Sequence, residues 1–412
     1  MSEFTTTVGN KRFLSLWVSQ VLSQLTVNIL SFVILIRLYE ITHSPIAASL
    51  LWITYAIPSI IVGPFAAAAV DLFDKRKVLM ASNLFQALIV LAYGLVLGRQ
   101  LVFFSYAVVF LYSFFNQFYV PAEAAGLAIY LKKERLTQAN SLFFITQQSA
   151  LVLGFGLGGV LTEALGFRPT VFLGAFLLFI AFIASSLLPS ARASNKLPSE
   201  FEDRVVDFFK QIMEGYKYIK DTKKVLLPFV LLLGLQVVIA VIVTNLPSIA
   251  SDLVRIDPKS SGLVVVVPAG LGAVLATFGI TKILSSGMRK RRLILIALAV
   301  LAVNVLVTSI FVPLVDDHSL RIAISMVMFV LTGFSVVAIL VPSITYMQEK
   351  TPKDLLGRVF GNFWFLTTVA TILPVVFSAT ITEVLGIRVL MILMGLICLS
   401  GFTLAVYKVK DL

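Results

Sequence analysis

One acidic residue stands out because it lies inside an apolar stretch of the sequence. Glu123 shares a helical face with Tyr112, Asn116 and Tyr119, which recur at steps of three and four residues. Ionisable groups in such stretches are rare and usually functional, so this face is predicted to line a central cavity in which Glu123 carries a proton. The alternative is a carboxylate at a helix end, paired with a nearby Lys or Arg, because Pro121 suggests that the stretch is nearly over.

Amide side chains in the first apolar stretch form a second candidate site. Gln20, Gln24, Asn28 and Ser31 fall on one face of a helix. In an apolar cavity such groups can fix the orientation of a neutral or weakly polar ligand. The alternative is hydrogen bonding between helices, worth about 0.6 kcal/mol on average. Further cavity candidates are Gln147, Gln148, Gln236, Thr244, Trp364, Thr367, Thr368 and Thr371.

Residues that could support enzymatic or metal chemistry do not form a catalytic or metal-binding motif in the sequence. His43 and His318 stand alone and Cys398 is the single cysteine, so no metal site, cofactor or disulfide is expected. The segment Gly154–Gly159 satisfies G-x-G-x-x-G, but it lies inside an apolar stretch without a preceding strand and is expected to allow close helix packing. The sequence has no Walker A motif, so energy would come from a gradient or from the substrate, and enzymatic activity is not expected.

The elements that must position these residues are transmembrane helices. Hydrophobic residues make up 59% of the 412-residue chain and charged residues 13%, and the mean hydropathy is +0.99. These values are far from the balance of a soluble domain. Apolar stretches of about 20 residues, enough to cross a bilayer, begin at Phe13, Pro45, Val78, Leu101, Gln138, Pro169, Val225, Gly262, Leu293, Arg321, Val359 and Arg388.

Basic residues alternate between the predicted loops. The net charge is +12, but Lys11, Lys75–Lys77 and Arg289–Arg292 all fall in loops on one predicted side. This distribution argues against a nucleic-acid partner. Because loops rich in Lys and Arg stay inside, both termini are predicted to be cytoplasmic.

One sequence pattern occurs twice. Leu161–Arg168 (Leu-Thr-Glu-Ala-Leu-Gly-Phe-Arg) returns as Ile381–Arg388 (Ile-Thr-Glu-Val-Leu-Gly-Ile-Arg). Each copy lies between two apolar stretches, so residues 1–189 and 225–412 are predicted to be two six-helix halves of a duplicated membrane bundle. Repeated halves of this kind indicate a transporter with its site between them.

A polar segment, residues 190–224, joins the halves. Its apolar residues recur at helical spacing, and they are Phe201, Val205, Phe208, Phe209, Ile212, Met213, Tyr216 and Ile219. The pattern predicts an amphipathic helix that lies on the inner membrane surface or packs under the bundle. Both alternatives place it on the cytoplasmic face.

Several segments carry a family resemblance that covers nearly the whole chain. Phe118–Glu123, Leu136–Leu142, Gly154–Gly159 and the linker segment Phe209–Lys220 resemble the bacterial branch of the major facilitator superfamily that contains siderophore exporters and macrolide-efflux-type permeases. The resemblance implies an all-α integral membrane protein with twelve transmembrane helices in two pseudo-symmetric six-helix bundles. It also implies alternating access in the bacterial inner membrane, and we expect a monomer.

The segment between the second and third apolar stretches resembles the family's cytoplasmic gating motif. It reads Ala-Ala-Ala-Val-Asp-Leu-Phe-Asp-Lys-Arg-Lys from Ala67, and its candidate residues are Asp71, Asp74, Lys75, Arg76 and Lys77. Asp71 is expected to make a contact present in only one transport state, which biases the conformational equilibrium. The basic residues could instead only set the topology.

The predicted function is secondary transport, with export of small amphipathic organic compounds such as drugs or siderophores, driven through a candidate proton site. Two departures from the family weaken the antiport inference, since Ser23–Asn28 contains no acid and Phe155 stands where the antiporter motif has Pro. The alternatives are a uniporter or uptake permease for a nutrient-like solute, and a lipid flippase-like protein.

Overall fold

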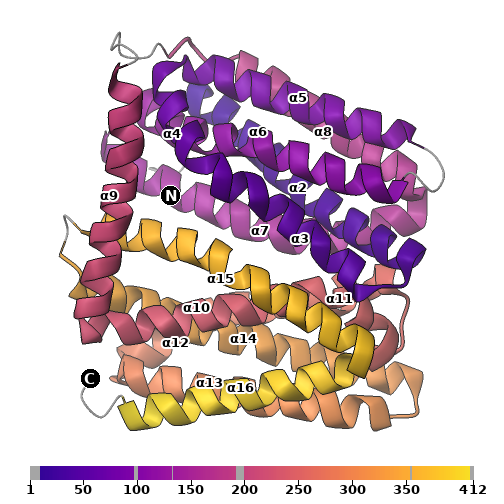
Figure 1. Ribbon diagram of the computed structural model, residues 1–412. Helices are drawn as coiled ribbons and strands as arrows, with labels where there is room; N and C mark the ends of the chain where they lie inside the picture. Colours follow the sequence, from indigo (N-terminus) through magenta and orange to yellow (C-terminus); the bar gives the residue numbers. More distant parts are fainter. Residues whose placement is uncertain (1–9, 97–100, 132, 192–198, 353–354, 409–412) are drawn as a thin grey trace. The chain divides into compact units, whose positions relative to one another are not determined.

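The computed structural model describes residues 10–96, 101–131, 133–191, 199–352 and 355–408. Some side chains within these ranges, including those of Ala67 and Asp71, lie outside the description. Regular structure in the described ranges is entirely helical (Figure 1). A chain in lipid must pair each peptide N–H and C=O internally, and a helix does this within one segment. The predicted all-α fold is confirmed.

Eleven of the described helices are long and apolar enough to cross a membrane. Helices α3 (Pro45–Ile61) and α4 (Gly63–Leu72) would together form a twelfth span, bent by 47°. The bend falls beside Pro64, whose nitrogen cannot donate a backbone hydrogen bond. This count agrees with the twelve predicted apolar stretches.

The chain divides into two compact units. The first comprises Met1–Ile41 with Leu50–Phe208, and the second comprises Thr42–Ser49 with Phe209–Leu412. Beside α3 and α4, the helices of the first unit are α2 (Lys11–Thr42), α5 (Lys75–Leu95), α6 (Leu101–Tyr130), α7 (Lys133–Leu165) and α8 (Phe167–Ser186). Those of the second are α10 (Lys223–Thr244), the short α11 (Leu246–Ser248), α12 (Val267–Ser285), α13 (Lys290–Phe311), α14 (His318–Lys350), α15 (Leu356–Leu385) and α16 (Ile387–Lys408).

The division between the units falls inside helix α9 (Ser199–Asp221), which occupies most of the predicted linker. The predicted domain boundaries at residues 189 and 225 stay predictions. Between α10 and α12 the chain makes two π-helical turns, Ile249–Val254 and Gly262–Val266, on either side of a short 3₁₀ turn, Pro258–Ser260.

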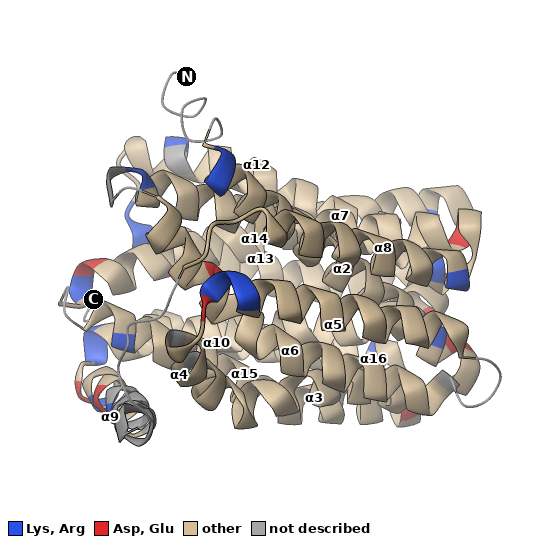
Figure 2. Ribbon diagram, turned by 90° about the horizontal axis from the view of Figure 1, so that it is seen from above, with Lys and Arg blue, Asp and Glu red and all other residues tan. Residues whose placement is uncertain are grey.

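Charged residues gather at the helix ends, and the middle of each span is almost free of them (Figure 2). In each unit, one end of the spans carries a run of basic residues, Lys75–Lys77 in the first unit and Lys290–Arg292 in the second. We call this end the basic end of the unit. A charge in the hydrocarbon region of a bilayer is costly, which accounts for this segregation.

The two copies of the repeated pattern have the same backbone geometry. Gly166 and Gly386 have φ angles of +87° and +84°, a conformation that side chains with a Cβ rarely adopt. Each glycine N–H donates to the carbonyl of a threonine four residues earlier, Thr162 or Thr382, at 3.0 Å. The repeat in the sequence therefore corresponds to a repeated helix–turn–helix corner, one in each unit.

Glycines let neighbouring helices pack with their backbones close together. A Cβ on Gly154 of α7 would lie 2.5 Å from Asn28 Cβ of α2, and one on Gly158 would lie 2.9 Å from Phe32 Cδ1. The expected packing role of the Gly154–Gly159 segment is confirmed. In the second unit Gly272 of α12 and Gly333 of α14 face the partner helix so closely that a Cβ would overlap the carbonyl oxygens of Val330 and Ala269.

Replacing Gly333 by Ala should therefore destabilise the second unit by about 1–3 kcal/mol, the usual range for overpacking. The measurement is thermal unfolding in detergent, where the melting temperature of Gly333→Ala should fall. The matched control is Gly234→Ala in α10, because a Cβ there meets no described atom within 4 Å. Equal melting temperatures for both variants would show that α12 and α14 do not need this backbone contact.

Candidate functional site

Glu123 lies inside helix α6, not at its end. The helix continues beyond Pro121 as far as Tyr130, so the proline does not terminate it. The Glu123 side chain is only 9% exposed, and no ion pair to it is seen in the described part of the chain. The sequence-based alternative of a helix-end carboxylate paired with Lys or Arg is thus wrong about the position of Glu123 in its helix. A proline ring can be accommodated within a transmembrane helix, so Pro121 does not mark the helix end.

A chain of hydrogen bonds leads away from Glu123 into the first unit. The hydroxyl of Tyr119 donates to the Glu123 carboxylate, and Ser19 Oγ of α2 lies 3.5 Å from Tyr119 Oη. Asn83 Nδ2 of α5 donates to Ser19 Oγ at 3.0 Å and to Ser185 Oγ of α8 at 2.9 Å. The chain therefore links four helices, and all its members are buried.

The series of hydrogen bonds leaves one oxygen of the Glu123 carboxylate without a partner. Glu123 Oε1 is buried and has no hydrogen-bond partner among the described residues. Burying an unpaired polar atom costs free energy, so such an atom within a native interior needs an explanation. One explanation is that the carboxyl group binds and releases a proton. The oxygen that takes up the proton must then not be held by a permanent hydrogen bond.

The rest of the predicted α6 face is used to hold α6 against α3. Asn116 Nδ2 donates to Tyr55 Oη at 3.1 Å, and the neighbouring Ser113 Oγ donates to the Tyr55 carbonyl at 2.6 Å. Tyr112 is 5% exposed, and its carbonyl accepts a hydrogen bond from Gln86 Nε2 at 3.3 Å. Tyr112, Tyr119 and Glu123 lie together on the interior face of α6, and their role in lining a transport cavity stays a prediction.

The amide side chains on one face of α2 differ in whether they already make hydrogen bonds. Gln20 is 3% exposed and donates through Nε2 to the Phe143 carbonyl of α7 at 3.0 Å. Asn28 Nδ2 donates to the Gln24 carbonyl of its own helix at 2.7 Å. Gln24 is half-buried, and its side chain makes no hydrogen bond that the described residues show. Of the three amides, Gln24 is the one best able to bind a ligand.

The other cavity candidates lie on α7, α10 and α15. Gln147 and Gln148 of α7 are exposed, Gln236 of α10 is half-buried, and Trp364 of α15 is 58% exposed. On α15 the hydroxyls of Thr368 and Thr371 donate to carbonyls of the preceding turn. The Thr367 hydroxyl oxygen is buried without a partner in the described part of the chain. Like Gln24, the side chains of Gln147, Gln148 and Gln236 make no hydrogen bond that the described residues show, so these amides, Thr367 and Trp364 all have binding capacity left.

Within the gating motif, Asp74 has a local structural role. It is the N-cap of α5, where Oδ1 accepts from the Arg76 amide at 2.9 Å. The same carboxylate accepts from Ser190 Oγ at 2.5 Å and from the Ala191 amide at 3.2 Å, so the α4–α5 turn is tied to the chain after α8. Burial alone would raise the pKa of Asp74, but these hydrogen bonds outweigh it and hold the pKa below its ordinary value.

The basic residues of the motif have different environments. Lys75 is 6% exposed and donates to the Phe73 carbonyl at 3.2 Å. Arg76 is half-buried and Lys77 is exposed. Asp71 lies in α4, but its side chain is outside the described residues. The expected gating role of these residues stays a prediction.

Sequence reasoning missed several buried polar residues. Ser19, Asn83 and Ser185 belong to the Glu123 chain, and in the second unit Asn245 Nδ2 donates to Ser378 Oγ at 3.0 Å while Thr382 Oγ1 donates to Asn245 Oδ1 at 2.8 Å. The available signal was an amide within an apolar stretch, as at Asn83. Its partners could not be identified from the sequence, because they lie 64 and 102 residues away.

Comparison with known proteins identifies a family and several relatives with similar sequences. Residues 16–374 match the family described as the Major Facilitator Superfamily. Multidrug efflux pump Tap of Mycolicibacterium fortuitum is 26% identical over 381 residues, covering 88% of this chain and 87% of Tap. Macrolide efflux protein A of Streptococcus pyogenes is 21% identical over 402 residues, covering 94% of each chain.

A solved structure has the same fold. The crystal structure of the nucleoside transporter NupG (D323A mutant) aligns with a TM-score of 0.71 and 11% identity, covering 97% of this chain and 100% of that chain. At this identity the likeness shows the fold alone. The family match extends over most of the chain and includes the helices that hold Glu123, Gln24 and the Asp74 turn. The chain therefore belongs to the Major Facilitator Superfamily, a family of multi-pass membrane transporters and not of enzymes.

Proposed function

We propose that this transporter exports small amphipathic organic compounds across the bacterial cytoplasmic membrane, and that protons drive it through Glu123. The observation that carries the proposal is the buried Glu123 carboxyl group, held on one side by Tyr119 and with Oε1 unpartnered. The proposed export direction draws support from Tap and macrolide efflux protein A, whose names describe efflux.

Elimination favours Glu123 as the coupling group. It is the one acid among the described buried residues, whose other charged members are Lys75 and Arg321. Asp74 is bound to Ser190 and Ala191, and Glu163 and Glu383 lie in the last turns of α7 and α15, opposite the basic ends. An ionisable group inside a membrane span is a functional candidate by default.

The proposed orientation follows from the charges. The basic end of each unit would face the cytoplasm, because Lys-rich and Arg-rich loops remain on that side. In this orientation the Asp74 turn and helix α9 would lie on the cytoplasmic side. Asp71 would then belong to a cytoplasmic gate, as the resemblance to the family motif implies.

A second candidate function is uniport, in which the substrate moves down its own gradient without protons. The specific observation in its favour is the sequence Ser23–Asn28 in α2, which holds no acid. In either case Gln24 of the first unit would contact a polar part of the substrate, because amphipathic ligands need few but well-placed polar partners.

Asp71 and Asp74 should respond differently to substitution. Asp74→Ala should destabilise the protein by about 1 kcal/mol, the usual cost of losing an N-cap, whereas Asp71→Asn should impair transport with little change in stability. Since folding lowers the pKa of Asp74, its contribution should be full above the ordinary Asp pKa of about 4 and be lost as pH falls through the lower folded-state value. Thermal unfolding across pH and transport in vesicles measure the two effects. Normal transport by Asp71→Asn would contradict the gate assignment.

Gln24 and Gln20 provide a matched pair one helical turn apart. Gln24→Ala should weaken the binding of a macrolide such as erythromycin, measured by calorimetry, by about 1–3 kcal/mol with little change in melting temperature. Gln20→Ala should instead lower the melting temperature, because the Phe143 carbonyl loses its donor. The reverse pattern would assign Gln24 to packing and Gln20 to the ligand.

Replacing Glu123 by Gln should abolish the dependence of transport on the pH gradient. A glutamine keeps an acceptor for the Tyr119 hydroxyl but cannot bind and release a proton. The assay is erythromycin flux in liposomes with an imposed pH gradient, and Glu163→Gln is the control for loss of an exposed acid. Gradient-dependent flux in Glu123→Gln would move the coupling site elsewhere, and a wild-type protein that ignores the gradient would favour uniport.

A further inference from the structure

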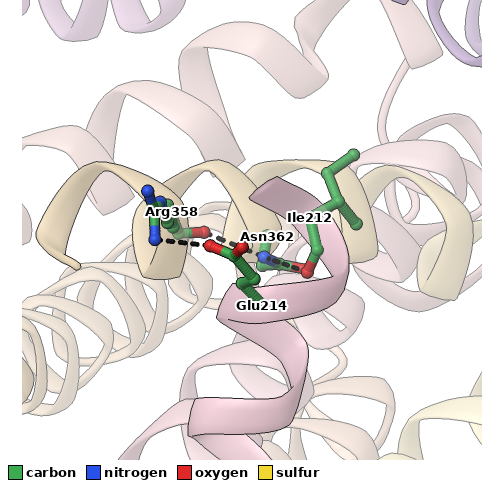
Figure 3. Close-up of polar contacts among 4 residues, drawn as sticks. All are labelled: Ile212, Glu214, Arg358 and Asn362. Carbon is green, nitrogen blue, oxygen red and sulfur yellow. Dashed lines mark hydrogen bonds and ion pairs between the residues drawn. The ribbon is translucent and has the colours of Figure 1, made fainter. Parts of the chain in front are cut away.

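The second half of helix α9 is fastened to the start of α15 (Figure 3). Asn362 Nδ2 donates to the Ile212 carbonyl at 2.9 Å and to the Arg358 carbonyl of its own helix at 2.9 Å. Beside it, the Arg358 guanidinium forms an ion pair with Glu214 at 2.5 Å. All four residues belong to the second unit.

Gly215 allows this close approach. A Cβ at that position would overlap the side-chain nitrogen of Asn362 and would lie 2.8 Å from the Arg358 carbonyl oxygen. One turn further on, Tyr218 Oη donates to the Lys350 carbonyl at 3.1 Å, and Ile219 is buried in a cluster that includes Val225 and Val359. These contacts fix the rotation of α9 about its own axis. They therefore also determine which side chains face away from α15.

The same contacts fix the depth of α9 relative to the membrane. Asp221 ends α9 and Lys223 begins α10, so a single residue separates α9 from a membrane span. Arg358 and Asn362 lie in the first two turns of α15, another span. About 20 residues cross the hydrocarbon of a bilayer and α15 has 30, so its first turns extend beyond the hydrocarbon and bring the second half of α9 to the level of the headgroups.

The free face of α9 combines apolar and basic side chains. Met213, Tyr216, Lys217 and Lys220 are spaced i, i+3, i+4 and i+7, so they share one face. Met213 is 65% and Tyr216 is 47% exposed, and both lysines are exposed. The side chains of Phe201, Val205, Phe208 and Phe209, which the sequence also placed on an apolar face, lie outside the described residues.

We propose that this face, consisting of Met213, Tyr216, Lys217 and Lys220, binds anionic phospholipids of the leaflet at the basic end. Its chemistry fits that partner, because apolar side chains can enter the headgroup boundary while lysines extend toward phosphate groups. Basic clusters beside a membrane span attract anionic lipids in this way. Topology alone would explain the lysines, but it would not require two exposed apolar side chains on the same face.

The proposal can be tested with a fluorescent probe on the full-length chain. A Cys398→Ala, Met213→Cys protein carries a single cysteine, which is labelled with acrylodan, whose emission shifts to the blue in an apolar environment. The labelled protein is reconstituted in phosphatidylcholine alone and in phosphatidylcholine mixed with phosphatidylglycerol. The emission should be bluer in the mixed liposomes, and added salt should reverse the shift because it screens charge.

Charge variants make the test specific. Lys217→Glu with Lys220→Glu should abolish the response to phosphatidylglycerol, since each lysine near an anionic surface contributes roughly a fivefold gain in binding. The matched control, Lys282→Glu with Arg292→Glu, makes the same change in net charge at the basic end of α12 and α13 and should keep the response.

Three results would overturn the proposal. Water-like emission in both kinds of liposome would mean that the face points to solvent or awaits a protein partner. Equal blue emission in both, insensitive to salt, would mean apolar insertion without selection for anionic lipid. Loss of the response in the control variant would assign it to overall charge. The salt titration of the labelled protein decides the matter even if a charge-reversal variant fails to fold.

Discussion

Most features of this molecule depend on one constraint, the absence of water around its membrane-spanning segments. A peptide group without a partner costs several kcal/mol in hydrocarbon, so the backbone must form helices. Lipid tails are as apolar as leucine side chains, and the helices therefore gain little from burying apolar surface against one another. Close packing and hydrogen bonds must hold them together. Gly154 and Gly158 in the first unit, and Gly272 and Gly333 in the second, bring helix backbones into contact for this reason.

The same constraint decides where charges can lie. Lys75 and Arg321 are buried, but both lie near helix ends and donate to loop carbonyls, those of Phe73 and Val315. Glu123 is different, because it lies well inside α6 and the described structure gives it one hydrogen-bonded oxygen and one unpartnered oxygen. A carboxyl group kept in this arrangement makes sense if it has a function, and the buried chain through Tyr119, Ser19 and Asn83 gives it a fixed position.

At the basic ends the chain uses polar contacts to attach its connecting segments to the spans. Asp74 caps α5 and also holds Ser190 and Ala191, while Asn362 and Gly215 hold α9 against α15. Both attachments join segments more than one hundred residues apart in sequence. Each connecting segment is thereby held to particular helices of its own unit. Helix α9 is thereby both a connection between units and a part of the second unit's surface.

The sequence by itself determined the membrane spans, their number and the duplication. These properties depend on local composition, because a stretch of about 20 apolar residues is stable in a bilayer as a helix whatever its neighbours are. The positive-φ corners at Gly166 and Gly386 were marked in the same way by a repeated local pattern. Fold and family could therefore be predicted from residues close together in the chain.

The tertiary structure alone decided which polar groups are already bonded. Gln20, Gln24 and Asn28 look equivalent on one helical face, yet Gln20 is bound to the Phe143 carbonyl and Gln24 has a free side chain among the described residues. Pro121 suggested the end of a span, but α6 continues past it and buries Glu123. Gly215 has no evident purpose in the sequence until Asn362 is found against it. The reason is physical: a hydrogen bond depends on distances of about 3 Å between atoms, and helix packing sets those distances between residues far apart in the chain.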